Sequence, residues 1–518
     1  MSNQRPLPLP SAILLQFAVS QSTLALQHIH APVYGQYLAK ESISTISLSL
    51  CLLFWAIGLL THKNSFRLPY SIAGLMIAGT PLVSHLLRDY SATWGPVHGP
   101  VIASIPYFIA YSGLTYLAAN ESTTYALLYF TTFVIFRMIP VHLPIPTCSI
   151  FRLCSTVIAL FPFLAKAGTL PKKRADRTVA KLVNRILYML ILAMCISSNV
   201  LMRRFEVNQC KMDTLKPNVL AHAESTTGYI SVIETDSAYG KLRLLRCDHS
   251  ILGGSYLEYG MDSIYGAFYM MDFVRFVERP QVVETSDLSA LQIGLGIGVS
   301  AKTLIDSGVK VDVVELDPIV SKYAKEFFEL PEPRLTYLDD GRKYLDNLNK
   351  TEYYDFILHD VFTGGLVPGQ LFTVDALKII KSSLKTDGVL AINFVGIVGD
   401  QATNTVISTI KTIFPNVLCF YENLAADQNE IQNLVFFATS FNSNIKFNYK
   451  QHDKNLPKGT YRAVLDEFKS QDGSLPYHVN VRPISDQFNP LKTHQVDSAY
   501  SHWKGVRAVF PTIWSDLY

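Results

Sequence analysis

Three glycines with a carboxylate behind them are the clearest chemical signal in the sequence. Gly294, Gly296 and Gly298 follow the apolar run 290–293 directly, and Glu315 comes about 20 residues after the first of them. Glycines let a backbone approach a ligand closely, and a carboxylate at that distance can accept hydrogen bonds from both ribose hydroxyls. The spacing predicts a nucleoside site, whereas by itself Glu315 could also be a solvated strand end.

Further carboxylates end the next strand-like runs. Asp339, Asp340 and Gly341 close the run that starts at Arg334. A carboxylate at this point can reach an adenine amino group, because ligands of open α/β folds bind at the carboxyl ends of the strands. Asp340 and Gly341 could equally form a common Asp-Gly turn.

Asp360 ends the apolar run 354–359 and is the candidate catalytic residue. A carboxylate there could hold a substrate ammonium, accept its proton and align the nitrogen. Its alternative role is to cap the following helix. His359 should point away from Asp360, because neighbouring residues of a strand face opposite sides.

These residues need a doubly wound α/β domain to bring them together. From about Gly228 to Leu491, strand-like runs alternate with helix-like runs, and two alternating runs joined by a turn come first, which predicts a small antiparallel β-unit. We expect a Rossmann-like fold of the S-adenosylmethionine-methyltransferase type. The expected strands are 229–235, 241–246, 290–293, 311–318, 334–340, 354–360 and 389–394, and the expected helices are 299–307, one that starts at Arg342, and 373–384.

The N-terminal part has a different composition. Before residue 206 there are 16 Lys and Arg but four acidic residues, whereas 38 acidic and 29 basic residues follow. Apolar runs long enough to cross the hydrocarbon core of a bilayer succeed one another there. They are 43–60, 69–87, 100–119, 124–139, 149–164 and 186–202, with a weaker run at 11–26.

The sequence thus predicts three parts: an integral membrane domain of about six or seven helices (1–205), a linker with the β-unit (206–285) and a Rossmann-like catalytic domain (286–518). The protein is expected to be a multi-pass membrane protein with the lipid bilayer as a partner. The positive-inside rule places the basic loop 166–181 in the cytosol, and one further crossing would put the catalytic domain on the other side of the membrane. The need for an adenosyl co-substrate favours the cytosol instead. The side of the membrane that carries the catalytic domain therefore stays open.

The seven cysteines lack the pairing and His neighbours of a zinc site. We therefore expect neither a disulfide framework nor a metal. No nucleic-acid partner is expected.

The ordered motifs of the C-terminal half resemble those of spermidine and spermine synthases, the polyamine aminopropyltransferases. The resemblance rests on 294–298, Glu315-Leu-Asp317, Asp340-Gly341, 354–360 and the closing segment 483–490. The segment 360–365 and its continuation to Leu377 resemble a membrane-fused, spermidine-synthase-like subgroup more closely.

This resemblance implies transfer of an aminopropyl group from decarboxylated S-adenosylmethionine to a small-molecule amine, in polyamine biosynthesis, by a homodimer. It implies Asp360 as the catalytic carboxylate and adds Asp317 to the nucleoside-binding residues. Two family carboxylates are replaced, by Ile297 in the glycine loop and by Thr363 after Asp360. Because Ile297 stands where the family holds the amine of its co-substrate, ordinary S-adenosylmethionine is an equally suitable donor.

Three hypotheses follow. The first is a membrane-anchored, spermidine-synthase-like aminopropyltransferase. The second is an S-adenosylmethionine-dependent methyltransferase, which the same fold and glycine loop would serve. The third is a catalytically silent domain that binds a nucleoside or a polyamine and regulates the membrane part.

Overall fold

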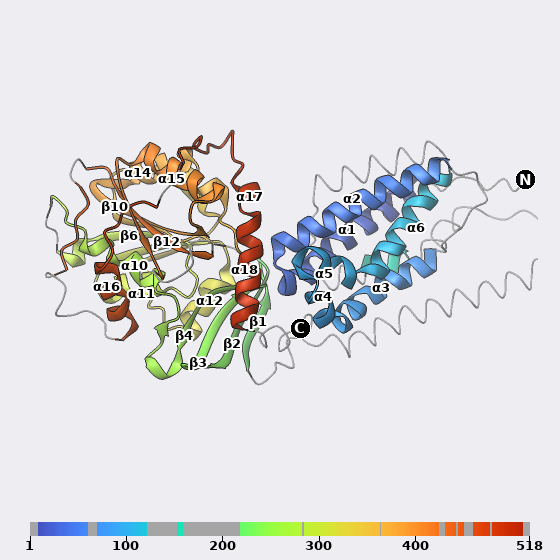
Figure 1. The fold of residues 1–518 in the computed structure, drawn as a ribbon, viewed down its shortest axis with the longest axis horizontal. Coiled ribbons are helices and arrows are strands. Elements are labelled where there is room, and N and C mark those ends of the chain that lie inside the picture. The colour runs from blue at the N-terminus through green and yellow to red at the C-terminus, as the bar shows by residue number, and fades with distance from the viewer. Residues whose placement is uncertain are drawn as a thin grey trace, which may run out of the picture. The chain divides into compact units, whose positions relative to one another are not determined.

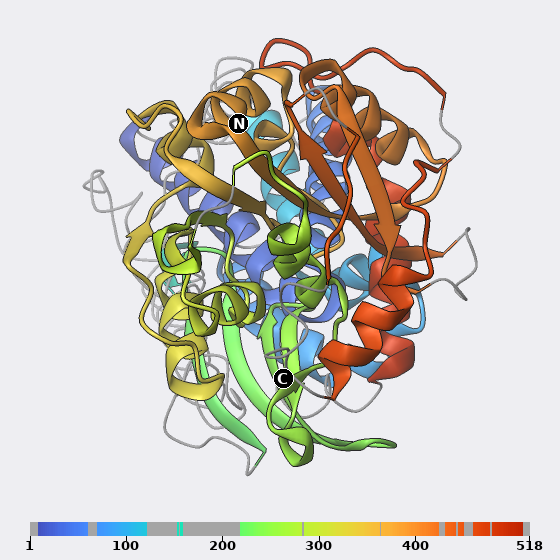
Figure 2. The ribbon, with the colours of Figure 1, turned by 90° about the vertical axis from the view of Figure 1, so that its left-hand side faces the viewer.

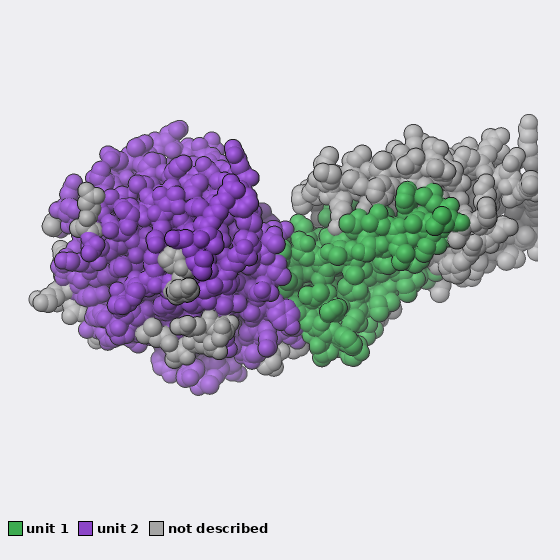
Figure 3. Space-filling model, turned by 45° about the horizontal axis from the view of Figure 1, so that its top comes forward, with its two compact units in different colours: residues 1–214, 514–518 green, residues 215–513 purple. Residues whose placement is uncertain are grey.

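The computed structural model describes residues 9–60, 70–121, 153–154, 156–158, 218–281, 284–362, 364–423, 430–441, 444–449, 459–476 and 479–510. The chain divides into two compact units (Figure 3). Unit 1 comprises residues 1–214 and 514–518, and unit 2 comprises residues 215–513. The predicted boundary at 205/206, the predicted spans 124–139 and 186–202, and Thr363 lie outside the described residues.

Unit 1 is helical wherever it is described. Its longer helices are α1 (Leu9–Tyr34), α2 (Gln36–Leu60), α3 (Tyr70–Leu86) and α6 (Ile105–Glu121), with the short α4 (Arg88–Ala92) and α5 (Gly95–Ala103) between the last two. Within the described ranges, α2 alone is long and apolar enough to cross a bilayer. A second candidate arises if α5 and the first part of α6, which meet at 67°, are counted as one span.

Unit 2 begins with a curved antiparallel sheet of five strands in sequential order. They are β1 (Val219–Glu224), β2 (Tyr229–Ser237), β3 (Gly240–Cys247), β4 (Ser250–Tyr256) and β5 (Asp262–Ser263). Figure 2 shows these green strands as a layer separate from the yellow-to-orange strands of the main sheet. The sequence predicted a hairpin of two strands, and the structure adds three more.

The main sheet has seven strands in the order β11-β12-β10-β9-β6-β7-β8. Its parallel strands are β6 (Ser289–Ile293), β7 (Lys310–Glu315), β8 (Leu335–Leu338), β9 (Tyr354–His359) and β10 (Leu384–Ile397). β12 (Ile431–Thr439) is antiparallel to both β10 and β11 (Asn416–Tyr421). The strand order reverses between β6 and β9, which makes this a Rossmann-like fold with its switch point beside the glycine loop.

Helices cover both faces of the main sheet (Figure 1). The apolar residues of α14 (Val374–Ser383) and α15 (Gln401–Ile413) pack on one face, and those of α10 (Ala267–Asp272), α11 (Val299–Asp306) and α16 (Thr460–Lys469) on the other. Burial on both faces explains why the strands read as almost continuous apolar runs. The remaining helices are α12 (Pro318–Phe327), α13 (Gly341–Asp346), α17 (Leu491–His494) and α18 (Val496–Val509).

Candidate functional site

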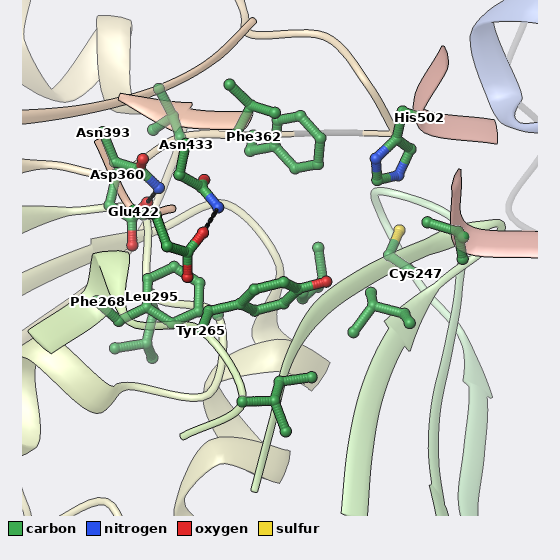
Figure 4. A pocket seen from close by; sticks show the side chains of 18 of the residues that line it. Cys247, Tyr265, Phe268, Leu295, Asp360, Phe362, Asn393, Glu422, Asn433 and His502 are labelled. Carbon is green, nitrogen blue, oxygen red and sulfur yellow. Dashed lines mark hydrogen bonds between the residues drawn. The ribbon is translucent and has the colours of Figure 1, made fainter. Parts of the chain in front are cut away.

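One pocket of about 860 Å³ lies within unit 2, at the carboxyl ends of the main-sheet strands (Figure 4). Chain direction explains which residues reach it. The parallel strands β6 to β10 and the strand β11 all end there, and because β12 runs the opposite way, its first residues lie there too. The β-unit and α18 supply the rest of the wall.

The glycine loop approaches the neighbouring strand end too closely for any side chain. Gly294 has a φ of +82°, and a Cβ atom there would stand 1.9 Å from the carbonyl oxygen of Asp360. At Gly296, a Cβ atom would stand 2.7 Å from the carbonyl oxygen of Leu252. Both glycines line the pocket, whereas Gly298 begins α11 and packs against Leu330.

Glu315 lines the pocket at the end of β7 and also holds the loop in place. Its carboxylate accepts hydrogen bonds from the backbone N–H groups of Leu295, at 2.9 Å, and Asp317, at 2.8 Å. Burial raises the pKa of Glu315 to about 7, although these two hydrogen bonds act against the rise. The side chain is 8% exposed, which excludes the alternative of a solvated strand end.

Asp340 and Gly341 line the pocket at the start of α13. One oxygen of Asp340 caps the helix by accepting hydrogen bonds from the N–H groups of Arg342 and Lys343, at 2.8 and 3.0 Å. Its other oxygen accepts none from the described residues. Asp340 is therefore the N-cap residue of α13, and its second carboxylate oxygen remains free to accept a hydrogen bond from a ligand in the pocket.

Asp317 and Asp339, which we predicted in the nucleoside site, do not line the pocket. Asp317 is fully buried, caps α12 and accepts hydrogen bonds from the hydroxyls of Ser225 and Thr227 at 2.6 and 2.7 Å. It ties the β-unit to the main sheet. Asp339 forms an exposed ion pair with Lys343 at 2.9 Å. Acids that follow a strand therefore divide between the site and the scaffold.

Asp360 is partly buried on the pocket wall, and its backbone N–H donates to the carbonyl of Ile293 at 2.8 Å. Asn393 of β10 donates its side-chain N–H to the carboxylate at 3.0 Å. Burial raises the pKa of Asp360 to about 6, while the Asn393 hydrogen bond lowers it. The following helix α14 is capped by Thr373 instead. His359 is buried and within 3.1 Å of the carbonyl of Leu371, away from the pocket, as predicted.

Several residues of the wall were not predicted from the sequence. Glu422 follows β11 and accepts hydrogen bonds from the Asn433 side chain and from the backbone N–H of Ala267, the latter at 3.2 Å. Tyr265 and Phe268 lie next to this carboxylate, with their ring centroids 5.7 Å apart (Figure 4). An acid after a strand was the available signal for Glu422, because the same signal identified Asp360.

The far end of the pocket is formed by the β-unit and α18. Cys247 lies there with its thiol 3.5 Å from the Thr227 hydroxyl. His502 packs edge-on against Phe362, with ring centroids 5.1 Å apart. Burial lowers the pKa of His502 to about 4, so its imidazole is neutral at pH 7.

The described pocket wall carries carboxylates without basic partners. Six acidic residues contribute to it, and no Lys or Arg does. The acidic residues are Asp236, Glu315, Asp340, Asp360, Glu422 and Glu430. A concave wall of one charge sign attracts ligands of the opposite sign. The pocket is therefore suited to a cationic ligand.

The wall has two halves, which we name for what distinguishes them. The glycine-loop half consists of Gly294, Leu295, Gly296, Glu315, Asp340 and Gly341. The carboxamide half consists of Tyr265, Phe268, Asp360, Asn393, Glu422, Gln432 and Asn433.

The glycine-loop half fits an adenosyl nucleoside. Gly294 and Gly296 line the pocket without side chains, Glu315 has lone pairs left for ribose hydroxyls, and Asp340 has an open oxygen. In the described part of the chain, no group of three or more His, Cys, Asp and Glu could hold a metal ion.

Comparison with known proteins finds similarity to two kinds of transferase. The chain is 35% identical over 319 residues to the N-terminal histidine N-methyltransferase of Emericella nidulans, a match that covers 57% of each protein. It is 36% identical over 108 residues to the polyamine aminopropyltransferase of Vibrio vulnificus, which covers 20% of this chain and 36% of that one. The chain thus spans 57% of the length of the first of these relatives and 36% of the length of the second. No family model matches.

Among solved structures, a probable spermidine synthase from Corynebacterium glutamicum matches with a TM-score of 0.39 and 18% identity. That match covers 52% of this chain and 99% of the other. Together, the sequence similarities support a relation to methyltransferases and aminopropyltransferases at a coarse level and do not decide between them.

Proposed function

We propose that unit 2 is an S-adenosylmethionine-dependent N-methyltransferase that methylates a nitrogen atom of an amine-containing acceptor. The first candidate for this acceptor is the N-terminal histidine of a polypeptide. The observation that carries the choice is the 35% identity over 319 residues to an N-terminal histidine N-methyltransferase, and Ile297 agrees with it. The side chain of Ile297 is 3% exposed and packs with Ile230 and Val232 of the β-unit. The aminopropyltransferases that the sequence resembles have at this position a carboxylate that holds the amine of the decarboxylated donor.

S-adenosylmethionine would supply a methyl group bound to a positively charged sulfur, and it would leave as S-adenosylhomocysteine. The acceptor nitrogen uses its lone pair to form the new N–C bond, while the electrons of the broken S–C bond stay on sulfur. The proton that the nitrogen gives up passes to the carboxylate of Asp360. The Asn393 hydrogen bond keeps that carboxylate aimed at the pocket.

The pKa of the acceptor nitrogen also favours an imidazole or an α-amine over a polyamine as the acceptor. An imidazole with a pKa near 6.5 is largely neutral at pH 7, and an α-amine with a pKa near 8 costs roughly 1 kcal/mol to deprotonate. A polyamine nitrogen with a pKa near 10 costs roughly 4 kcal/mol. A single carboxylate with a pKa of about 6 is matched to the weaker bases.

Aminopropyl transfer is the second candidate. It is favoured by the match to the Vibrio vulnificus aminopropyltransferase and by the acidic wall, which suits a polycation as well. The product separates the two reactions, because aminopropyl transfer releases methylthioadenosine.

We also propose that unit 1 is embedded in a lipid bilayer. α2 supports this, because its large apolar side chains Leu48, Leu52, Leu53, Leu59 and Leu60 are exposed. An exposed apolar face of this kind is typical of a surface that contacts lipid or another protein. Retention of the full-length chain in membranes after alkaline carbonate extraction would be expected, and release into the supernatant would overturn the proposal.

The functional proposal is tested with the full-length chain in detergent. It is incubated with S-adenosylmethionine and a peptide that begins with histidine, and in parallel with decarboxylated S-adenosylmethionine and putrescine or spermidine. S-adenosylhomocysteine and a peptide heavier by one methyl group are the expected products of the first reaction. Methylthioadenosine from the second reaction alone would replace the proposal by aminopropyl transfer, and binding of neither nucleoside would overturn both.

A further inference from the structure

The carboxamide half contains a second carboxylate that the chemistry described above does not use. Glu422 lies at the end of β11, and its backbone N–H donates to the carbonyl of Asn433 at 3.2 Å. Its carboxylate accepts hydrogen bonds from the side chain of Asn433 and from the backbone N–H of Ala267. These two hydrogen bonds hold the carboxylate of Glu422, while the backbone contact with Asn433 fixes its main chain (Figure 4).

Glu422 has no cationic partner among the residues that the structure describes. Glu422 is half-buried, and carboxylates withdrawn from water are normally paired with a base or bind a ligand, because an isolated charge is costly to remove from water. Burial accordingly raises the pKa of Glu422, against the hydrogen bonds from Asn433 and Ala267. A positively charged ligand group would supply the missing partner.

Two buried amide oxygens of pocket-lining residues also lack donors. Oδ1 of Asn393 and Oε1 of Gln432 have no hydrogen-bond partner in the described residues, although these side chains are only 4% and 9% exposed. Both residues line the pocket. Unsatisfied buried acceptors are unfavourable, and an ammonium group offers three donors and no acceptor. This half of the pocket therefore has a surplus of acceptors that a cationic amine would satisfy.

Aromatic side chains complete the wall. Tyr265 and Phe268 flank Glu422, and Phe362 lies across the pocket from them (Figure 4). Aromatic faces favour both a flat heteroaromatic ring and a neighbouring cation. An acceptor with a ring and an ammonium group would use both kinds of surface.

We propose that Glu422, held by Asn433, binds an ammonium group of the acceptor, so that the acceptor carries a free amine in addition to the nitrogen that reacts at Asp360. A polypeptide with a free N-terminal histidine has both groups. This inference rests on the proposed function for the identity of the acceptor. The assignment of Glu422 as an ammonium-binding residue rests on the hydrogen-bond geometry alone.

The test measures binding to the full-length chain in detergent, saturated with S-adenosylhomocysteine. The ligands are a peptide that begins with histidine, the same peptide with des-amino-histidine in its place, and spermidine. Glu422→Gln keeps the size of the side chain and removes its charge, and Glu332→Gln is the matched control because Glu332 is 75% exposed and outside the pocket. We expect Glu422→Gln to weaken binding of the free-amine peptide by about 10- to 100-fold and to leave the des-amino peptide unchanged.

Each outcome decides a separate point. Equal affinity of the wild-type protein for the two peptides, or unchanged affinity in Glu422→Gln, would overturn the inference. In another outcome, the wild-type protein binds spermidine and neither peptide, and Glu422→Gln loses the spermidine binding. That pair of results would keep Glu422 as an ammonium site and reject the N-terminal histidine as the acceptor. Failure to bind any amine would overturn the inference, while failure to bind S-adenosylhomocysteine would strike the proposed function instead. If Glu422→Gln does not fold, Glu422→Asp retains the charge and should weaken binding less than tenfold.

Discussion

The two edges of the main sheet treat their buried carboxylates in opposite ways. At the amino edge, where the parallel strands begin, Asp355 accepts hydrogen bonds from Arg279 at 2.8 Å and from Lys385 at 2.9 Å. Asp312 forms a bidentate salt bridge with Arg334, whose two N–H···O distances are both 2.7 Å. At the carboxyl edge, Asp360 has an amide partner and no basic one among the described residues.

The pKa directions follow from this difference. At the amino edge, burial acts to raise the pKa of Asp355, but hydrogen bonds from Lys385, the N–H of Ser289 and Arg279 hold it below its usual range. At the carboxyl edge, burial prevails and raises the pKa of Asp360 to about 6. Paired carboxylates serve the scaffold, and the unpaired ones remain for a ligand. Five predictions test this distinction.

The largest effect is expected from Asp360→Asn. The substitution removes the proton acceptor and keeps the shape and the backbone contact with the glycine loop. We expect kcat to fall by about 100-fold or more, with little change in the affinity for S-adenosylmethionine or in the unfolding temperature. Turnover and calorimetric binding measure the two quantities. Full turnover in this variant would remove Asp360 from the mechanism.

Asp355→Asn should give the opposite result. It leaves Arg279, which is 8% exposed, with only Asp387 of its two buried acidic partners, and it removes the acidic partner of Lys385, so the free energy of unfolding should fall by about 3 kcal/mol. kcat/KM should stay unchanged at a temperature where the variant is folded. Thermal unfolding and turnover on the same sample provide the check. A loss of activity without a loss of stability would contradict the distinction between the two edges.

Gly294→Ala tests the close approach at the switch point. The added methyl group would stand 1.9 Å from the carbonyl oxygen of Asp360 in a backbone with positive φ, so both stability and nucleoside binding should suffer, stability by about 2 kcal/mol or more. Gly260→Ala is the matched control, because Gly260 has a φ of +66° but no atom within 4 Å of the added group. Nucleoside binding that is equal in the two variants would contradict the loop's role.

The pH dependence should differ in sign between the two edges. As a base, Asp360 must be deprotonated, so kcat/KM should rise with pH and be about tenfold lower at pH 5 than at pH 7. Its raised pKa means that the folded chain retains the proton longer, so its contribution to stability is present below about pH 4 and is lost as the pH rises through about 6. The lowered pKa of Asp355 gives a contribution that is present above about pH 4 and is lost as the pH falls.

A pH–rate profile and unfolding measured from about pH 2 to pH 8 check these signs. In Asp360→Asn the fall of stability with rising pH should become smaller, whereas in Asp355→Asn the loss of stability toward low pH should become smaller. A flat pH–rate profile for the wild-type protein would contradict the role of Asp360 as a base.

The smallest effect is expected from Asp486→Asn in the closing segment 483–490. Asp486 accepts two hydrogen bonds of 2.7 Å from Arg342 in α13, but the carboxylate is 43% exposed, so solvent screens the pair. We expect a loss of about 0.5–1 kcal/mol of stability and a small rise in KM for the nucleoside, because Arg342 follows Asp340 and Gly341 directly. A loss of activity comparable to that of Asp360→Asn would place Asp486 in the site itself.

The glycine-loop half of the site could largely be predicted from the sequence. Gly294, Gly296 and Glu315 belong to one strand-loop-helix-strand unit, so their spacing along the chain defines their spacing in space. The carboxamide half could not be predicted in this way. Tyr265 precedes the main sheet, whereas Glu422 and Asn433 come from its last two strands, and no local spacing relates them.

Sequence likewise did not separate site acids from scaffold acids. Asp317 follows β7 as Asp360 follows β9, but Asp317 turns into a helix cap and a contact with Thr227, which is 90 residues away. The partners that occupy a carboxylate come from distant elements, and they decide its role.

The sequence by itself therefore determined the Rossmann-like fold, the glycine loop and the placement of acids at the ends of β7, β8 and β9. These features depend on apolar periodicity and on residues close together in the chain. The tertiary structure decided which acids are paired with Arg or Lys and which face the pocket alone. That distinction depends on strand order, on the reversed direction of β12 and on burial, none of which is local.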